Sequence, residues 1–489
     1  MVHTNHFDER TYRDALTRIC LDPLKILQDA SSPNAFHNSG ERYDPPKCHE
    51  NTRVAALKKI MDWIIGCDPR TRDKWIMWLS GAAGAGKSAI GQTMAERCDA
   101  EERLLASFFF GRSDGTRNHA KFLIPTIACQ IYANIPGARN DIASVINNDP
   151  LIFNKSLLIQ LMSLVVEPVK RLGDTVSQHL IIIDGLDECV DRASQVIVLR
   201  MLFDVVQKHK CRIRFLVASR PEHDIVNAFS SENVEVILAR LVLDDEYQSY
   251  EDIKLFLTDK FKDITKTHPF RNLIPKEWPG HGVVWEITKK SSGQFVYASV
   301  VVKYVESIRH RPNDRLAIVR NLRPRQGGSD MPFAELDALY THILSSVENP
   351  SLVVEILSFV IHQAQIDDRI SVFMRAVLVN VVEETHDLEP GSLQILLCDL
   401  GALVAVDTNP TKRKSIKVFH ASILDFLVDP SRSKDLHIPV SLLIAKHVTN
   451  CLRFLSSAFI PLKICFYTFT SNLLQRILIT IAFPLLSIF

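Results

Sequence analysis

This sequence has no closely spaced cysteine pair, no apolar segment near its start and no apolar run long enough to span a bilayer. Its ten cysteines include no C-x-x-C pair and no Cys/His grouping at zinc spacing, which argues against a structural zinc site. Residues 1–18 are polar and charged and lack the apolar segment of a signal peptide. These two observations predict a reduced, cytoplasmic location in which the thiols are free.

An excess of charge of either sign is also absent. Lys plus Arg number 57 and Asp plus Glu 56, for a formal charge of +1, so no overall field draws the chain to nucleic acid or to an anionic membrane. No internal repeat of solenoid or propeller length is present. At 489 residues, with 46% hydrophobic and 23% charged residues, the chain is expected to fold into several units without a specific nucleic-acid partner.

The C-terminal tail is the most apolar stretch of the sequence. Within residues 454–489 the longest run without a polar residue other than serine or threonine is 477–489, which is shorter than the about 20 residues that span a bilayer. We therefore expect a packing helix pair, or a chain truncated before its natural continuation. A membrane anchor is the less favoured alternative.

The rest of the chain is organised around residues 75–88, which have the sequence WIMWLSGAAGAGKS. An apolar run of strand length enters a G-x-x-x-x-G-K-S loop, and residues 89–98 then have a helical pattern. Glycines without a Cβ allow backbone N–H groups to surround a triphosphate, and the helix N-terminus adds its positive end. The predicted nucleotide-binding residues are Gly81, Ala82, Ala83, Gly84, Ala85, Gly86, Lys87, Ser88 and Ala89.

Two residues of this loop have particular expected roles. Lys87 places its charge on the β- and γ-phosphates, and the hydroxyl of Ser88 is positioned for Mg²⁺. An ordinary glycine-rich turn is the alternative, but the strand before the loop and the helix after it favour a P-loop.

Four further strands alternate with helical segments, at 104–110, 180–184, 214–219 and 234–238. The run 180–184 is continuously apolar and ends in carboxylates, which is typical of a buried parallel strand whose end opens on a site. The alternation predicts an α/β fold, a P-loop NTPase parallel sheet with helices on both faces.

Charged residues follow two of these strands. Asp184 is the expected second partner of Mg²⁺, and Asp187 or Glu188 is expected to orient or deprotonate the attacking water. Arg220 follows the strand that, in P-loop folds of the additional-strand type, lies between the P-loop strand and the acidic strand, so it should face the γ-phosphate. The alternatives are helix-capping acids and a surface arginine before Pro221.

Beyond residue 243 the pattern becomes helical, and it ends in the helix, helix and hairpin order of a winged helix. The basic turn 412–414 is interpreted as a solvated wing tip rather than a DNA contact. His420, at the strand-to-helix corner, is by itself more typical of packing or capping than of ligand contact. The expected domains are an N-terminal helix and linker (1–47), a P-loop nucleotide-binding domain (48–243), an all-α helical domain (244–330), a winged-helix domain (331–435) and an apolar tail (436–489).

Several motifs together resemble one family. The P-loop is accompanied by LIIIDGLDEC at 180–189 and FLVASRPE at 215–222, and further support comes from CHENTR at 48–53, SSGQFVYAS at 291–299 and VFHASILDFLVDPSRS at 418–433. With these motifs the chain resembles the NACHT class of STAND signalling ATPases, and specifically the NACHT proteins of mushroom-forming fungi. The resemblance covers about residues 45–450.

The resemblance implies ATP or ADP with Mg²⁺ as cofactors, and a nucleotide-dependent conformational switch with slow hydrolysis. It implies that Thr52 and Arg53 close over the adenine, by backbone more than by side chain, and that His420 contacts the β-phosphate of ADP in the closed state. It also implies signal transduction of an innate-immunity-like kind, self-association through the NACHT domain on activation, and protein partners that the sequence does not identify.

One departure from the family pattern bears on function. Family members usually continue after the winged helix into WD, ankyrin or tetratricopeptide repeats, and this sequence contains none, which argues against autonomous sensing of a ligand. The alternatives are a non-hydrolysing, nucleotide-bound scaffold and a membrane-tethered protein. A kinase for a small substrate is less favoured, because it has no use for the D-G-L-D-E motif and a winged helix.

Overall fold

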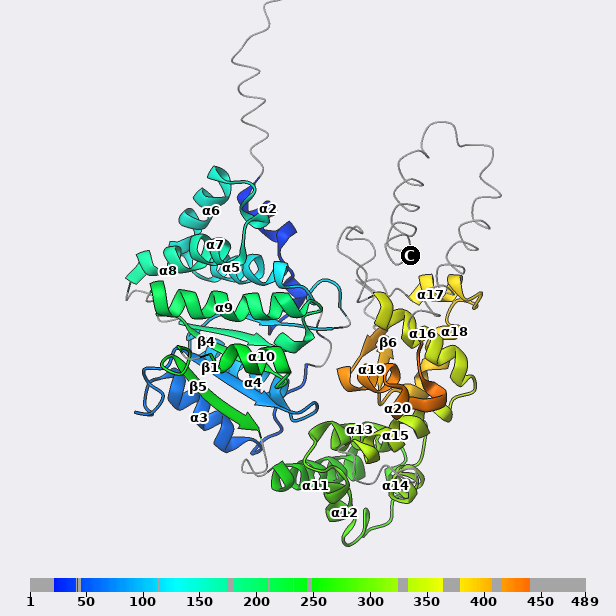
Figure 1. Ribbon diagram of the computed structural model, residues 1–489. Helices are drawn as coiled ribbons and strands as arrows, with labels where there is room; N and C mark the ends of the chain where they lie inside the picture. The colour runs from blue at the N-terminus through cyan, green and yellow to red at the C-terminus, as the bar shows by residue number, and fades with distance from the viewer. Residues whose placement is uncertain are drawn as a thin grey trace, which may run out of the picture.

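The computed structural model describes residues 22–40, 42, 45–112, 114–173, 179–209, 212–231, 233–243, 249–323, 333–363, 379–406 and 416–439. The start of the N-terminal region, the basic turn 412–414 and the apolar tail 454–489 lie outside these ranges. The described residues form two units, a nucleotide-binding unit built on a sheet and a C-terminal unit built mainly of helices (Figure 1).

A five-stranded sheet forms the centre of the nucleotide-binding unit. Its strands are parallel and lie in the order β2-β3-β4-β1-β5, so the strand before Arg220 lies between the P-loop strand and the acidic strand, as predicted. The strands are β1 (Ile76–Gly81), β2 (Leu104–Phe109), β3 (Leu180–Asp184), β4 (Arg214–Ser219) and β5 (Leu238–Leu243).

Helices cover both faces of this sheet (Figure 1), which is why β1 to β4 are buried at every residue. Because side chains alternate along a strand, Met77 and Leu79 pack on one face with α3 (Val54–Ile64) and α4 (Lys87–Ala100), and their neighbours Ile76 and Trp78 pack on the other. The second face is covered by α5 (Leu123–Asn134), α9 (Arg192–His209) and α10 (His223–Phe229), with α6 (Arg139–Asn148), α7 (Leu157–Leu161) and α8 (Glu167–Leu172) beyond them.

The position of the last strand differs from the prediction. We expected it at 234–238, whereas β5 begins at Leu238 and runs to Leu243. Val234 and Ile237 are buried, but from a turn in which the Ile237 N–H donates to the Val234 carbonyl at 3.0 Å. Their apolar pattern therefore reflects a packed turn before the strand and not the strand itself.

The N-terminal segment that we expected to be a helix and a linker packs onto the nucleotide-binding unit. Helix α2 (Pro23–Ala30) and the short 3-10 turn Pro33–Ala35 place Leu27 and Ala35, both 0% exposed, in the core above the sheet. The next residues run beside edge strand β2, where the His37 N–H donates to Ser107 Oγ at 3.0 Å. This segment thereby covers one edge of the sheet.

The C-terminal unit has a single hydrophobic core that extends from Ile253 to Ile438. The predicted helical and winged-helix domains therefore share one core. Its helices are α11 (Ser249–Thr267), α12 (Val283–Lys290), α13 (Phe295–Val305), α14 (Pro312–Asn321), α15 (Ala334–Ser345), α16 (Pro350–Gln363), α17 (Val379–Thr385), α18 (Ser392–Leu397), α19 (Ala421–Val428) and α20 (Pro430–Ser433).

A short antiparallel hairpin lies between α18 and α19. Its strands are β6 (Val404–Val406) and β7 (Ile416–Val418). A hairpin was expected in this region, and the winged-helix domain stays a prediction. None of the helices within the described ranges is both long and apolar enough to cross a membrane.

If the N-terminal segment is part of the nucleotide-binding unit, Leu27→Ala should destabilise strand β2. Removing a fully buried leucine side chain leaves a cavity and typically costs about 2–5 kcal/mol, so hydrogen exchange of the β2 and α5 amides should become faster. Lys25→Ala, at an exposed position of the same helix, is the matched control and should leave this exchange unchanged. Equal exchange in Leu27→Ala and wild type would show that the segment contributes nothing to the unit.

Candidate functional site

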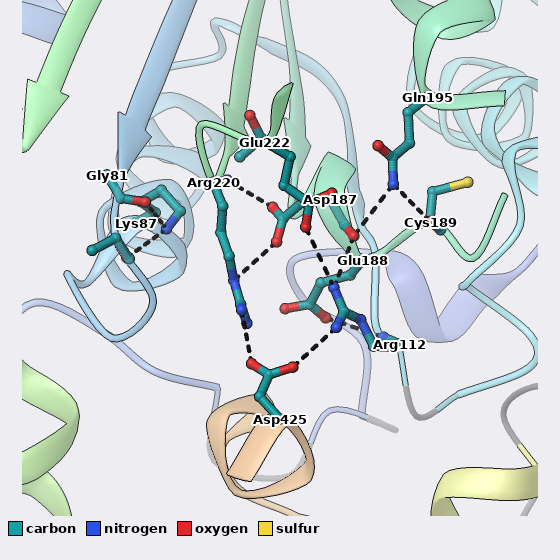
Figure 2. A network of polar contacts seen from close by, with 12 residues as sticks. Gly81, Lys87, Arg112, Asp187, Glu188, Cys189, Gln195, Arg220, Glu222 and Asp425 are labelled. Carbon is teal, nitrogen blue, oxygen red and sulfur yellow. Dashed lines mark hydrogen bonds and ion pairs between the residues drawn. The ribbon is translucent and has the colours of Figure 1, made fainter. Parts of the chain in front are cut away.

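The P-loop joins the end of β1 to the start of α4. Gly84 and Gly86 have φ of +75° and +92°, in the left-handed region that favours glycine. Lys87 opens α4 and is 9% exposed, and its ammonium donates to the carbonyl oxygens of Gly81 at 2.8 Å and Ala82 at 2.9 Å (Figure 2). The lysine therefore lies back across its own loop.

The charged residues that the sequence singled out lie close enough to act on this lysine. Burial lowers the pKa of Lys87, and Asp187 is the largest of the charges that oppose this effect. Asp184 and Glu188 also raise it, whereas Arg220 lowers it. The structure thus brings the predicted acids and arginine together around the P-loop.

Asp184 and Ser88 together fit a hydrated magnesium ion. Asp184 ends β3 and is 3% exposed, and burial raises the pKa of its carboxyl while a hydrogen bond with the Ser88 side chain opposes this. Its Oδ1 is buried and has no hydrogen-bond partner. Mg²⁺ prefers such hard oxygens and is usually held by one or two carboxylates together with substrate phosphates and water. Among the described residues there is no cluster of three or more His, Cys, Asp or Glu that could hold a metal ion.

Arg42 is a second cation near this carboxylate, and the sequence analysis did not predict it. Its guanidinium lies over the ring of Phe109, 3.9 Å from the centroid, and its Nη1 donates to Gln92 Oε1 at 2.6 Å. Phe109 is paired with Asp184 in the sheet. Arg42 favours the ionised form of Asp184, and burial lowers the pKa of the arginine itself to about 10.

Asp187 and Arg220 form a buried pair between the ends of β3 and β4. Asp187 is 4% exposed, its Oδ1 accepts the Arg220 N–H at 2.9 Å, and its Oδ2 lies 3.1 Å from Arg220 Nε. The Gln195 amide supports the acidic turn by donating to the carbonyl of Cys189 at 2.9 Å. Both carboxylate oxygens of Asp187 are therefore committed to holding Arg220.

Glu188 has a different environment. Its Oε2 accepts the Arg112 N–H at 3.1 Å. Burial, followed by the charge of Asp187, raises the pKa of Glu188 to about 7, while the Arg112 hydrogen bond opposes the rise. A carboxyl that titrates near neutral pH is suited to take a proton from water, so of the two predicted acids Glu188 is the one whose chemistry fits a general base.

Arg220 also reaches the C-terminal unit. Its Nη1 lies 2.7 Å from Oδ2 of Asp425, a residue of α19. Burial acts to lower the pKa of Arg220, but the charges of Asp425 and then Asp187 outweigh it, so the pKa is raised. Arg220 is thus held between Asp187 of its own unit and Asp425 of the C-terminal unit (Figure 2).

Arg112 and Asp425 are functional candidates that sequence reasoning missed. Arg112 Nη1 donates to Asp425 Oδ1 at 3.0 Å, and Arg112 Nη2 donates to the Asp187 carbonyl at 3.1 Å. Arg112 lies three positions after the last residue of β2, and Arg220 lies one position after the last residue of β4. Both arginines therefore lie at the carboxyl edge of a parallel sheet, and this position after a predicted strand was a signal available in the sequence. Asp425 lies within the quoted HASILDFL segment, but nothing in its spacing identified a partner.

The segment around Thr52 and Arg53 connects the P-loop with the C-terminal unit. Arg53 Nη2 donates to the carbonyl of Ala85 at 2.7 Å, and the backbone N–H of Arg53 donates to Asp252 Oδ2 of α11 at 3.0 Å. The Arg53 guanidinium lies 4.7 Å from the ring centroid of Phe295. The Thr52 hydroxyl donates to the carbonyl of His49 at 2.7 Å. The side chain of Arg53, and not its backbone alone, therefore contacts the loop.

The start of α13 covers the P-loop at Gly84. The Val296 N–H donates to the Gly84 carbonyl at 3.4 Å. A Cβ added at Gly84 would lie 2.3 Å from Val296 Cγ1, so this position requires glycine for the close approach as well as for its φ.

His420 is the residue immediately before α19, in an extended backbone conformation. It lies one turn and a half before Asp425 on the element that reaches the nucleotide-binding unit. Its contact with a bound diphosphate stays a prediction.

A family model described as nephrocystin 3, N-terminal, matches residues 57–220. The matched range contains the P-loop, β3 with its acids, and Arg220, and it does not extend to the C-terminal unit. Together with the loop geometry, this match supports a nucleotide-binding NTPase of the P-loop type. No curated protein matches the chain.

Among solved structures the chain is similar to several P-loop proteins at low identity. For ORC2 of Aeropyrum pernix, solved as ADPNP and ADP complexes, identity is 12%, the TM-score is 0.32, and 85% of this chain and 97% of that chain are covered. For a Walker-type ATPase of Pyrococcus abyssi, identity is 13%, the TM-score is 0.37, and 78% of this chain and 98% of that chain are covered. For Cdc6p of Pyrobaculum aerophilum, identity is 11%, the TM-score is 0.33, and 83% of this chain and 96% of that chain are covered.

The raised pKa of Glu188 predicts a pH dependence of stability. The unfolded state loses this proton near pH 4.5 and the folded state near pH 7, so the folded state binds more protons between these values and the free energy of unfolding should fall as pH rises through this window. Because Glu188 is partly exposed, we expect an effect of about 1–2 kcal/mol. Glu188→Gln should remove this part of the pH dependence in urea unfolding.

The control for this measurement is Glu251→Gln, at an exposed position of α11. That variant should keep the wild-type dependence. A Glu188→Gln profile parallel to wild type between pH 4.5 and 7 would contradict the raised pKa.

Proposed function

We propose that this protein binds ATP and ADP with Mg²⁺ at residues 81–89, hydrolyses ATP slowly, and uses the exchange of the two nucleotides to change how its C-terminal unit contacts the nucleotide-binding unit. This is the function of a NACHT-type signalling ATPase of the STAND group, of the fungal kind that the motifs resemble. We further propose that it acts in the cytoplasm and self-associates when the contact opens.

One observation carries the proposal of a switch. Arg220 pairs with Asp187 of the nucleotide-binding unit at 3.1 Å and with Asp425 of the C-terminal unit at 2.7 Å. The residue placed to meet a γ-phosphate is therefore also a residue that joins the two units. A ligand that changes the partner of Arg220 must change the free energy of the contact between them.

Each site residue has a role in this scheme. Lys87 binds the β- and γ-phosphates, and Ser88 and Asp184 hold Mg²⁺, which supplies charge neutralisation at the phosphates. Glu188 accepts a proton from the attacking water, and Arg220 stabilises charge that develops on the γ-phosphate. Asp187 positions Arg220.

The energies required are small. A ligand shifts a two-state equilibrium only by its difference in affinity for the two states, and a change from 1:99 to 99:1 needs about 5.5 kcal/mol. Loss or gain of contacts to one charged residue at a partly buried interface is of the right order, because charge-assisted hydrogen bonds contribute about 1.5–3 kcal/mol each.

The basic test is nucleotide binding by calorimetry. Lys87→Ala should weaken the binding of both ATP and ADP at least tenfold, because it removes the ammonium that the P-loop sequence assigns to the phosphates. Lys58→Ala, in which an exposed lysine of α3 is removed, is the control and should bind as wild type. Failure of the wild-type protein to bind either nucleotide at micromolar concentrations would refute the proposal.

A second test separates the switch from a scaffold that binds nucleotide without using it. Glu188→Gln should abolish phosphate release with ATP and trap the protein in one state by sedimentation velocity. Unchanged sedimentation of Glu188→Gln and wild type with ATP and with ADP would instead favour the scaffold.

A third test concerns His420, which we propose to contact the β-phosphate of ADP. Mass spectrometry of the nucleotide released from purified protein should show ADP in the wild type and much less in His420→Ala. Equal retention of ADP in the two proteins would remove His420 from the scheme.

A further inference from the structure

We propose that Arg112 and Arg220 form a two-arginine binding site for the terminal phosphate of ATP, and that the carboxylate of Asp425 occupies this site as an internal anion when the C-terminal unit is closed. The inference rests on the proposed nucleotide site and adds to it a second phosphate-binding residue, Arg112, and the group that competes with the phosphate.

The first observation is the way one carboxylate joins two guanidinium groups. Asp425 Oδ1 accepts a hydrogen bond from Arg112 Nη1 at 3.0 Å, and Asp425 Oδ2 lies 2.7 Å from Arg220 Nη1 (Figure 2). Planar guanidinium groups are suited to bind the oxygens of carboxylates and phosphates alike. A pair of arginines that converges on one anion can therefore accept either group.

The second observation is that both arginines are positioned by their own unit. Arg220 is held by Asp187 through its Nε and its N–H. Arg112 donates from Nη2 to the Asp187 carbonyl at 3.1 Å and lies 3.9 Å from Glu222 Oε1. Neither arginine needs Asp425 to keep its orientation, so the anion site remains formed when α19 moves away.

The third observation is the location of the pair. Arg112 follows β2 and Arg220 follows β4, so both lie at the carboxyl edge of the sheet, on either side of the acidic turn after β3. The P-loop follows β1 at the same edge, and β1 lies beside β4 in the sheet. A terminal phosphate bound at Lys87 would therefore lie near the end of β4, where Arg220 follows.

The fourth observation is that Asp425 offers each arginine a single oxygen. Its Oδ1 accepts from Arg112 Nη1 at 3.0 Å, and its Oδ2 lies 2.7 Å from Arg220 Nη1. A terminal phosphate carries more charge and three oxygens, and it can satisfy both guanidinium groups. ATP should thus displace Asp425, whereas ADP lacks the group that competes with it.

If Asp425 leaves and no anion replaces it, two partly buried arginines lose a common counter-charge. Arg220 keeps its pair with Asp187, but loss of the shared carboxylate leaves the pair of arginines with one negative charge fewer, which is unfavourable for charges that are partly removed from water. The Asp425 carboxylate of α19 and a γ-phosphate therefore cannot both bind Arg112 and Arg220 at the same time. This competition couples the kind of bound nucleotide to the position of the C-terminal unit.

The test compares the affinities of the full chain for ADP and for the non-hydrolysable analogue ADPNP by calorimetry. Asp425→Asn removes the competing charge at nearly constant volume, so it should increase ADPNP affinity relative to ADP by about tenfold or more. Asp387→Asn is the matched control, because this aspartate is exposed in the same unit and its φ of +53° is tolerated by asparagine. The control should keep the wild-type ratio.

The role of Arg112 is tested in the Asp425→Asn background, where the arginine no longer has the carboxylate as a partner. Adding Arg112→Gln should weaken ADPNP at least tenfold and leave ADP within about twofold. Thermal unfolding of each variant checks that it is folded, and Asp425→Ser replaces Asp425→Asn if the latter is not.

The outcomes separate this inference from the proposed function. If wild type binds neither nucleotide, the proposed function fails. If both bind, but Asp425→Asn has the same ADPNP-to-ADP ratio as wild type and Asp387→Asn, the competition by Asp425 is refuted. Equal loss of ADPNP and ADP on adding Arg112→Gln would refute the assignment of Arg112 to the terminal phosphate.

Discussion

The buried pair between Asp187 and Arg220 is the interaction on which the rest of the site depends. It connects the ends of two adjacent strands, and it uses both oxygens of Asp187. Asp187 is committed in this way, whereas burial and then the charge of Asp187 raise the pKa of Glu188 to about 7. The outer nitrogen Nη1 of Arg220 is directed toward the C-terminal unit. Asp187, Glu188 and Arg220 therefore have different environments although they lie close together.

The contacts between the two units converge on the phosphate end of the P-loop. Val296 packs on Gly84, Arg53 connects Ala85 with Asp252, and Asp425 reaches the arginines that follow two strands. A ligand bound in the loop would therefore lie close to several contacts between the two units. This arrangement is what the proposed switch requires.

Much of the nucleotide-binding unit could be predicted from short stretches of sequence. The P-loop, the acidic strand and the strand before Arg220 each carry a local pattern of apolar residues and a polar end, and their order in the sheet follows from the P-loop fold. The prediction was less accurate where tertiary packing buries apolar residues that lie outside a strand or helix. Val234 and Ile237 are apolar because a turn buries them, and residues 31–40 have a turn-rich, linker-like sequence although Ala35 enters the core.

The sequence by itself determined which residues are predicted to bind phosphate and metal, because glycine spacing and a carboxylate at a strand end are each recognisable within one short segment. Only the tertiary structure decided which charges share a partner. Arg112, Arg220 and Asp425 are separated by up to 313 positions in the chain, and an ion pair leaves no periodicity or spacing at either end. Electrostatic partners depend on distance in space, so the assignment of Asp425 to two arginines required the fold.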